Sequence, residues 1–214
     1  MAGPQLAAAR VDYVDVFQFH GVQPQAYGRV VERFLPEALR AQEQGELRFL
    51  GIPERYIEDG AHAMLPMALA DNHFDTIMVG YNLLAPSAER FVLPEAQRLD
   101  VGVMIMFAVR RALSRPTHLV ETITRLKERG LLAQDELSSD DPLGWLVHGG
   151  VESVTSAAYR FVAANPAVSS VLSGTANINH LEDNVRSLLG SPLPAADRAR
   201  ILDLFGHIEE CVVE

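Results

Sequence analysis

Short runs of apolar residues alternate along the chain with longer segments in which apolar residues recur at helical spacing. The short runs are rich in β-branched and aromatic residues and lack regular polar alternation, which is typical of strands in a parallel sheet joined by helices. We expect strands within residues 11–19, 47–52, 74–81, 101–107 and 168–174. The pattern predicts an α/β fold of about five parallel βα units whose strands are covered on both faces.

The segments between these runs predict the helices. One helix is expected from about Pro24 to Gln44, ended by Gly45, and the helix after the third strand is expected to be capped around Ser87. Residues 132–150 form an acidic, turn-rich insertion. The remaining helices are expected within residues 61–72, 117–130, 151–165 and 175–189, with a C-terminal helix from about Pro194 to Glu210.

Length and charge narrow the class of protein. A chain of 214 residues is expected to form one domain, 1–214. Its formal net charge is −10 and it has no run of Lys or Arg, which disfavours nucleic acid as a partner. The longest apolar run, Val101 to Val109, is far shorter than the ~20 residues of a membrane-spanning helix, so no membrane partner is expected.

The cysteine count and the N-terminal sequence favour a cytoplasmic location. Cys211 is the only cysteine, so no disulfide can form within the chain. The first ten residues lack the apolar stretch of a secretory signal. The seven histidines are dispersed and no zinc spacing is present, so no metal site is expected.

A histidine, His20, follows the first apolar run in the stretch "YVDVFQFHGV" and is followed at once by Gly21. Two interpretations are open from the residues alone. A histidine at the end of a buried strand can be a core residue satisfied by the backbone, or it can donate a hydrogen bond to a substrate at the carboxyl end of the sheet.

Five segments together resemble the aldo-keto reductase family. They are "YVDVFQFHG", "LRFLGI", "FDTIMVGYNLL", "PEAQRLDVGVMIMFA" and "SSVLSGTANINHLEDNV", of which the last is the most specific. Their order and spacing resemble the family from its fourth barrel strand to its C-terminus. The resemblance implies a partial (β/α)8 TIM barrel, with an N-terminally truncated domain that lacks the family's first three barrel units.

The resemblance also implies a function and site residues. Family members reduce carbonyl compounds with NADPH, so a small-molecule carbonyl substrate and NADP are expected. His20 resembles the histidine that polarises the substrate carbonyl, and Tyr81 resembles the tyrosine that stacks on the nicotinamide ring. Thr175 resembles a hydroxyl that contacts the 2′-phosphate, while Asp183 and Asn184 resemble residues on the adenine.

Several positions depart from the family's pattern. His180 stands where an arginine usually grips the 2′-phosphate, and Met78 stands where many members carry glutamine. Pro53 and Glu54 stand where Ser-Asn commonly binds the carboxamide. The only lysine, Lys127, is expected on the outer side of the barrel, where it cannot tune a catalytic tyrosine.

Three functional hypotheses follow. The first is an NADP-dependent reductase impaired by the absence of the family's Asp/Tyr/Lys set, because general acid catalysis typically contributes ~10²–10⁴-fold. The second is a noncatalytic half-barrel that binds or assembles, with homo-oligomers forming through exposed strand edges. The third pairs His20 with Glu54 for cofactor-free acid/base chemistry, although Glu54 is expected to be a solvent-exposed loop residue.

Overall fold

The computed structural model describes residues 11–212. Its centre is one sheet of five parallel strands in the order β1-β2-β3-β4-β5, so each strand pairs with its neighbour in the sequence. The strands are β1 (Val14–Gln18), β2 (Leu47–Pro53), β3 (Thr76–Gly80), β4 (Gly102–Met106) and β5 (Val168–Val171). The predicted α/β fold of five parallel βα units is confirmed.

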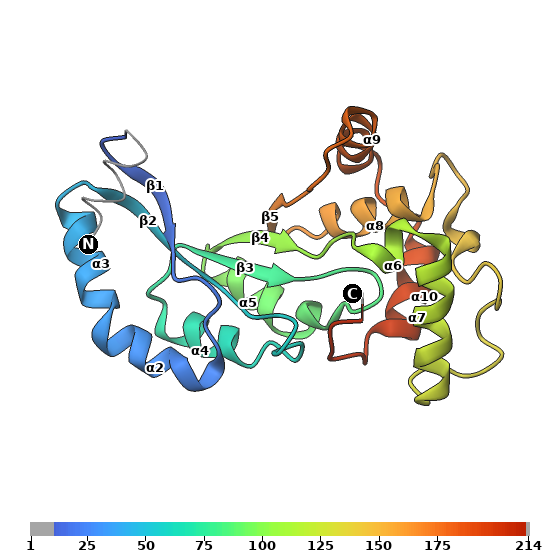
Figure 1. Cartoon of the computed structure of the whole chain (residues 1–214), viewed down its shortest axis with the longest axis horizontal. Coiled ribbons are helices and arrows are strands. Elements are labelled where there is room, and N and C mark those ends of the chain that lie inside the picture. The colour runs from blue at the N-terminus through green and yellow to red at the C-terminus, as the bar shows by residue number, and fades with distance from the viewer. Residues whose placement is uncertain (1–10, 213–214) are drawn as a thin grey trace.

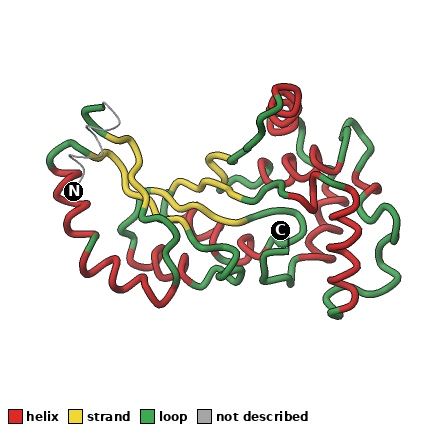
Figure 2. Tube along the Cα trace, viewed as in Figure 1, coloured by secondary structure: helices red, strands yellow, loops and turns green. Residues whose placement is uncertain are grey.

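Figures 1 and 2 show helices along one side of the sheet, with no described helix on the other side of β1 to β4. Burial follows this arrangement: Ile77, Val79, Val103 and Ile105 are at most 1% exposed, whereas the alternate positions of β3 and β4 are largely half-buried. The prediction that both faces are covered was therefore wrong. The open face is the one that a closed barrel would turn toward its interior.

The first crossover consists of two helices, α2 (Pro24–Arg33) and α3 (Leu35–Glu43). The sequence predicted one continuous helix, but Pro36 lies in the first turn of α3. A proline has no N–H to donate, and its ring clashes with the carbonyl four residues earlier, so the chain breaks at Phe34. Gly45 follows α3 with a left-handed φ of 76°, as a glycine at a helix end allows.

The next crossovers carry α4 (Met64–Asp71), the 3₁₀ turn η1 (Ser87–Arg90) and α5 (Val92–Arg98). Ser87 was predicted to cap a helix, but no side chain caps η1 or α5. The Ser87 hydroxyl instead bonds to His62. Asn72 ends α4 in the left-handed region with φ 51°.

The C-terminal half contains α6 (Arg111–Ser114), α7 (Pro116–Glu128), η2 (Gly144–Leu146), α8 (Val154–Ala163), α9 (Ile178–Leu188) and α10 (Ala195–Phe205). Helix α8 begins at Ser153, whose hydroxyl accepts a hydrogen bond from the Ser156 N–H, as an N-cap residue does. The last helix ends at Phe205, five residues earlier than its pattern predicted. Ile208 and Val212 then return to the core, at 1% and 3% exposure.

Two strands, β1 and β5, have only one strand neighbour each among the described residues. Exposed apolar side chains accompany the β1 edge: Val16 is 37% exposed and Phe49, its partner on β2, is 42% exposed. Among residues 11–212, no helix is both long enough and apolar enough to cross a bilayer.

Candidate functional site

A cavity of about 460 Å³ lies at the carboxyl ends of β1, β2 and β4, where the chemistry of parallel βα proteins is located. We name it the His20 cavity. Most of its wall comes from the segment that leaves β2, and the rest comes from the ends of β1 and β4. Its lining residues are His20, Gly21, Glu54, Arg55, Tyr56, Ile57, Glu58, Met106 and Phe107.

His20 reaches this cavity as predicted, but its ring is not buried. The residue is exposed, and no hydrogen bond of its side chain is found within residues 11–212. The interpretation of His20 as a core residue satisfied by the backbone was therefore wrong. The physical reason is the place of His20 after the edge strand β1, where the described chain covers it from one side only.

Glu54 contradicts the expectation of an exposed loop residue, because its side chain is 0% exposed. Its carboxyl group accepts a hydrogen bond from the Gly80 N–H and is hydrogen-bonded to His62 Nδ1. Burial raises the pKa of Glu54, and the hydrogen bond from His62 opposes that shift. The residue therefore belongs to the protein interior, although it borders the His20 cavity.

Tyr81, the predicted nicotinamide-stacking residue, is 0% exposed. Its ring packs against Phe161 with the centroids 5.4 Å apart, and its hydroxyl donates to Glu89. Burial and the Glu89 carboxylate raise the pKa of Tyr81 well above its ordinary value. In this arrangement the ring has no free face for a ligand, so its stacking role stays a prediction that requires Tyr81 to move.

Phe107 is an aromatic of the His20 cavity that the sequence did not single out. It follows β4 with φ 63°, a left-handed conformation that residues other than glycine rarely adopt. The Arg110 guanidinium lies 4.7 Å from its ring centroid, and Tyr56 meets its ring edge-on at 5.4 Å. Its place directly after an apolar strand was the only sequence signal available.

A second cavity, of about 450 Å³, lies between the end of β4, the start of α8 and α9. We name it the Thr175 cavity. It brings together three predicted cofactor-binding residues, Thr175, Asp183 and Asn184, which come from the loop after β5 and from α9. Its remaining lining residues are Val109, Ser114, Arg115, Ser153, Thr155, Tyr159, Gly174 and His180.

The polar groups of the Thr175 cavity are mutually ordered. Asn184 donates from Nδ2 to the Ser173 hydroxyl at 2.8 Å, and Ser173 also bonds to the Tyr159 hydroxyl at 3.0 Å. The Thr175 hydroxyl accepts from the Asn177 N–H at 3.1 Å. Asp183 pairs with Arg186 at 2.8 Å, which neutralises its carboxylate beside the cavity.

Hydroxyls, an amide, His180 and Arg115 suit an anionic, hydrogen-bonding ligand. The N-terminal ends of α8 and α9 border the same space, and helix N-termini favour anions. Only Ala108 separates Phe107, which lines the His20 cavity, from Val109, which lines the Thr175 cavity. The two cavities therefore lie close together along the chain after β4.

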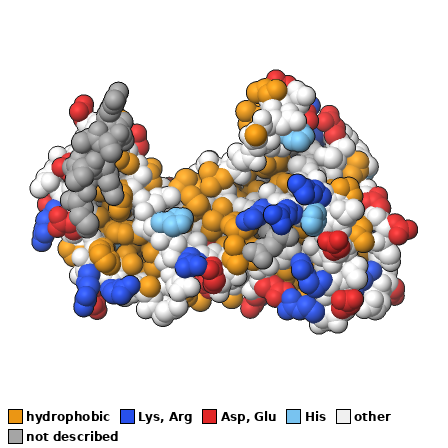
Figure 3. All heavy atoms as spheres, in the orientation of Figure 1, with side chains coloured by type: hydrophobic (Ala, Val, Ile, Leu, Met, Phe, Trp, Pro, Cys, Tyr) orange, Lys and Arg blue, Asp and Glu red, His pale blue; other side chains and the backbone are white. Residues whose placement is uncertain are grey.

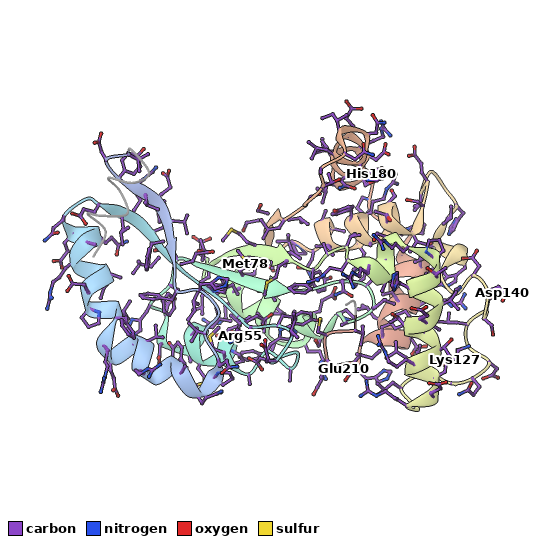
Figure 4. The ribbon with its side chains drawn as sticks, viewed as in Figure 1. Arg55, Met78, Lys127, Asp140, His180 and Glu210 are labelled. Atoms are coloured by element: carbon purple, nitrogen blue, oxygen red, sulfur yellow. The ribbon has the colours of Figure 1, made fainter. Side chains whose placement is uncertain are left out.

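Figure 4 labels three of the residues discussed above as departures from the family's pattern, namely His180, Met78 and Lys127. His180 lies on α9, and Met78 lies within β3 in the middle of the sheet. Lys127 lies on α7, where its Nζ donates to the Gln134 and Leu137 carbonyls at 2.8 and 2.6 Å. The lysine is therefore committed to the loop after α7 and serves neither cavity. No group of three His, Cys, Asp or Glu side chains able to hold a metal lies within residues 11–212.

A protein-family model described as the aldo/keto reductase family matches residues 5–204. An uncharacterized oxidoreductase of Bacillus subtilis, YqkF, is 24% identical over 188 residues, which are 85% of this chain and 57% of that protein. This chain thus spans little more than half the length of that relative.

Solved structures share the fold. The holo form of aldo-keto reductase AKR11C1 from Bacillus halodurans matches 94% of this chain and 64% of its own, with a TM-score of 0.67 and 23% identity. An aldo-keto reductase from Klebsiella pneumoniae in complex with NADPH matches 98% of this chain and 65% of its own, with a TM-score of 0.61 and 19% identity. Both matches cover less than two thirds of the solved chains.

Proposed function

Because this chain belongs to the aldo/keto reductase family, we propose that it binds NADP(H) and carries part of the machinery that reduces a carbonyl compound to an alcohol. The observation that carries the proposal is the pair of neighbouring cavities at the carboxyl ends of one parallel sheet. The NADPH complex of the Klebsiella pneumoniae relative supports the choice of dinucleotide.

The proposal assigns one end of the dinucleotide to each cavity. Thr175 and His180 hold the 2′-phosphate, and Asp183 and Asn184 hold the adenine. The lining of the His20 cavity, which includes Phe107, would then hold the nicotinamide end. The bound cofactor supplies a hydride, and the protein's own task is to orient the carbonyl and exclude water.

His20 is the proposed catalytic residue. An imidazole N–H donates a hydrogen bond to the carbonyl oxygen, where negative charge develops in the transition state. In this proposal β1 corresponds to the family's fourth barrel strand, and residues 1–214 form one domain that corresponds to the later part of the barrel. The exposure of His20 is what that correspondence leads us to expect, since the neighbouring barrel units are not part of the described chain.

Catalysis by this form is proposed to be impaired. Lys127, the only lysine, is bonded to backbone carbonyls of the loop after α7, so it cannot lower the pKa of a tyrosine beside His20. Burial raises the pKa of Tyr56, the tyrosine that lines the His20 cavity, which makes it a poorer acid. Turnover about 10²–10⁴-fold below that of a reductase with a proton donor is the expected consequence.

Fluorescence and thermal shift test the binding half of the proposal. Titration with NADPH is expected to quench the Trp145 emission and raise the melting temperature, because ligand binding to the native state stabilises it. The absence of both effects with NADPH and with NADH would count against cofactor binding. An assay of NADPH oxidation with an aromatic aldehyde tests the catalytic half separately.

A second candidate function is a noncatalytic half-barrel that associates through its strand edges. The observation in its favour is the unpaired β1 edge, beside which Val16 and Phe49 are exposed. Figure 3 also shows hydrophobic side chains across the hollowed part of the molecular surface that it displays. Light scattering tests it: a defined oligomer that Val16→Lys converts to monomer supports association through β1. A wild-type monomer argues against it.

A further inference from the structure

Three polar side chains from separate segments are buried together beneath the His20 cavity. Glu54 follows β2, His62 precedes α4, and Ser87 begins the 3₁₀ turn η1, and these residues are 3%, 3% and 5% exposed. His62 Nδ1 lies 2.9 Å from Glu54 Oε2, and His62 Nε2 lies 2.9 Å from the Ser87 hydroxyl. One continuous hydrogen-bonded chain therefore joins the loops after β2 and β3.

Glu54 links this hydrogen-bonded network to the sheet. The Gly80 N–H donates to Oε1 at 2.7 Å, so the carboxylate also ties the end of β2 to the end of β3. Both carboxylate oxygens lie within 3.1 Å of His62 Nδ1. The side chain is fully shielded from solvent, so no water can replace a lost partner at once.

The same residues hold the wall of the His20 cavity. The segment from Glu54 to Glu58 supplies most of that wall. Within it, the Tyr56 ring stacks on His62 with the centroids 5.5 Å apart and the planes inclined by 17°. The Tyr56 ring also packs closely against Gly80, where an added Cβ would lie 2.1 Å from the ring. Displacement of His62 must therefore displace Tyr56 and reshape the cavity.

His62 is held in a conformation that it would not adopt freely. Its φ is 60°, in the left-handed region that favours glycine. The contacts of the His62 ring with Glu54, Ser87 and Tyr56 stabilise this unfavourable backbone conformation. Loss of the Glu54 contact therefore releases the backbone as well as the side chain.

The charged groups around Glu54 and His62 are mostly acidic. The Asp59 carboxylate, which accepts from the N–H groups of Ala63 and Met64, raises the pKa of Glu54, although burial is the larger cause. Cys211 and Glu210 of the C-terminal segment lie close enough to Tyr56 to raise its pKa, and Glu210 is paired with Arg129. A negative charge left on the Glu54–His62 pair thus meets no other cation among the groups that contact it.

We propose that Glu54, His62 and Ser87 form a proton-dependent latch that positions the wall of the His20 cavity. The latch is closed while the buried Glu54 carboxyl holds its proton and is electrically neutral. Release of that proton to solvent leaves a buried negative charge and frees the segment from residue 54 to residue 62. Glu54 and His62 are positioning residues in this account, because they act on the cavity through Tyr56.

The direction of the pH dependence follows from the chemistry of the carboxyl group. A carboxyl whose pKa is raised by folding stabilises the folded arrangement fully below its ordinary value, 4.5, and loses that contribution as the pH rises through the raised value. The latch is therefore expected to be closed at mildly acidic pH and to open as the pH increases.

Hydrogen exchange of the protein without ligand tests the latch. The amide protons of Glu58, Asp59 and His62 bond to carbonyls within the same segment, so their protection reports its order. After correction for intrinsic rates, we expect exchange there to become several-fold faster between about pH 5 and about pH 9, while amides of α7 keep their protection. Protection of the segment that does not change with pH would overturn the proposal.

Two substitutions at Glu54 identify the titrating group. The amide of Glu54→Gln can still accept from the Gly80 N–H and can donate to His62, so we expect a closed segment at every pH. Glu54→Ala removes this link, so we expect fast exchange at every pH. The matched control is Glu58→Gln, an exposed glutamate of the same segment, which is expected to keep the wild-type pH dependence.

Glu54→Gln, which keeps the size and shape of the side chain, tests the proposal even if Glu54→Ala does not fold. A Glu54→Gln protein that keeps the wild-type pH dependence would show that another group titrates, which would refute the latch. The regulatory consequence rests on the proposed function, since it assumes that the His20 cavity receives the carbonyl and the nicotinamide. Exchange is measured without NADPH, so a failure of cofactor binding and a failure of the latch are separate results.

Discussion

The two cavities differ in how completely the described chain builds them. Around Thr175, every polar residue predicted for the cofactor has a partner: Asn184 bonds to Ser173, Asp183 to Arg186, and the Thr175 hydroxyl accepts from a backbone N–H. Around His20, the predicted catalytic ring is exposed and without a hydrogen bond among residues 11–212. The order of the Thr175 cavity does not extend to the His20 cavity.

Sheet topology explains the contrast. The Thr175 cavity is bordered by α8 and α9, which the chain itself supplies, whereas His20 follows the edge strand β1. A site between two consecutive βα units needs only those units, and a site at a sheet edge needs whatever pairs with that edge. If the proposed function is right, cofactor binding and catalysis are expected to be separable in this chain.

A pair of glycines gives the largest expected difference between the two regions. Gly80→Ala places a Cβ 2.1 Å from the Tyr56 ring, so we expect about 1–3 kcal/mol of destabilisation from overpacking and disruption of the His20 cavity. Gly174→Ala, in the Thr175 cavity, meets no atom within 4 Å and is expected to change stability by less than about 1 kcal/mol. Chemical denaturation of both variants measures the difference, and equal effects would contradict this account of packing.

Two asparagines on α9 test which cavity binds the dinucleotide. Asn184→Ala removes a side chain that lines the Thr175 cavity and bonds to Ser173, so we expect NADPH to bind about tenfold more weakly, as for the loss of a hydrogen bond in a desolvated site. Asn179→Ala, on the same helix but outside the cavity lining, is expected to leave the affinity unchanged. Calorimetric titration of both variants is the measurement, and equal losses would place the ligand elsewhere.

His180 sharpens the assignment of the phosphate. A guanidinium makes paired, charge-assisted hydrogen bonds to phosphate that an imidazole cannot. His180→Arg is therefore expected to increase the preference for NADPH over NADH by roughly fivefold, a change of about 1 kcal/mol. An unchanged ratio of the two dissociation constants would remove His180 from the 2′-phosphate site.

His20 itself gives the smallest expected effect on the isolated chain. Because its ring is exposed and makes no hydrogen bond among residues 11–212, His20→Ala is expected to change the free energy of unfolding by less than about 0.5 kcal/mol. NADPH affinity is likewise expected to stay unchanged, and any detectable turnover to disappear. A large loss of stability would show that the ring has contacts that the present arrangement lacks.

The strands were the most predictable part of the fold. The apolar run at residues 101–107 predicts a strand, and β4 spans Gly102–Met106. The break between α2 and α3 was missed because the apolar spacing continues through Phe34, while the proline that ends the pattern lies two residues later. The exposure of one face of the sheet was also missed. An apolar run predicts that both faces of a strand are covered, but it does not show whether residues of the same chain cover them.

The site was predicted unevenly for a physical reason. Thr175, Asp183 and Asn184 are close in sequence, so a local motif was enough to bring them together. The Glu54–His62–Ser87 chain joins three distant loops, and no local pattern distinguishes a buried glutamate from an exposed one. Tyr81 follows a strand, but the direction of its side chain depends on the packing of Phe161, which lies on a helix far along the chain.

The most direct test of the central claim is an NMR titration of the ¹⁵N-labelled chain with NADPH. The account predicts saturable shifts of the amides of residues 174–184, with smaller shifts in the segment from residue 54 to residue 58, and weaker binding of NADH. Shifts confined to the β1 edge, or no shift in residues 174–184 at saturating NADPH, would contradict the claim that this chain builds the cofactor half of the site by itself.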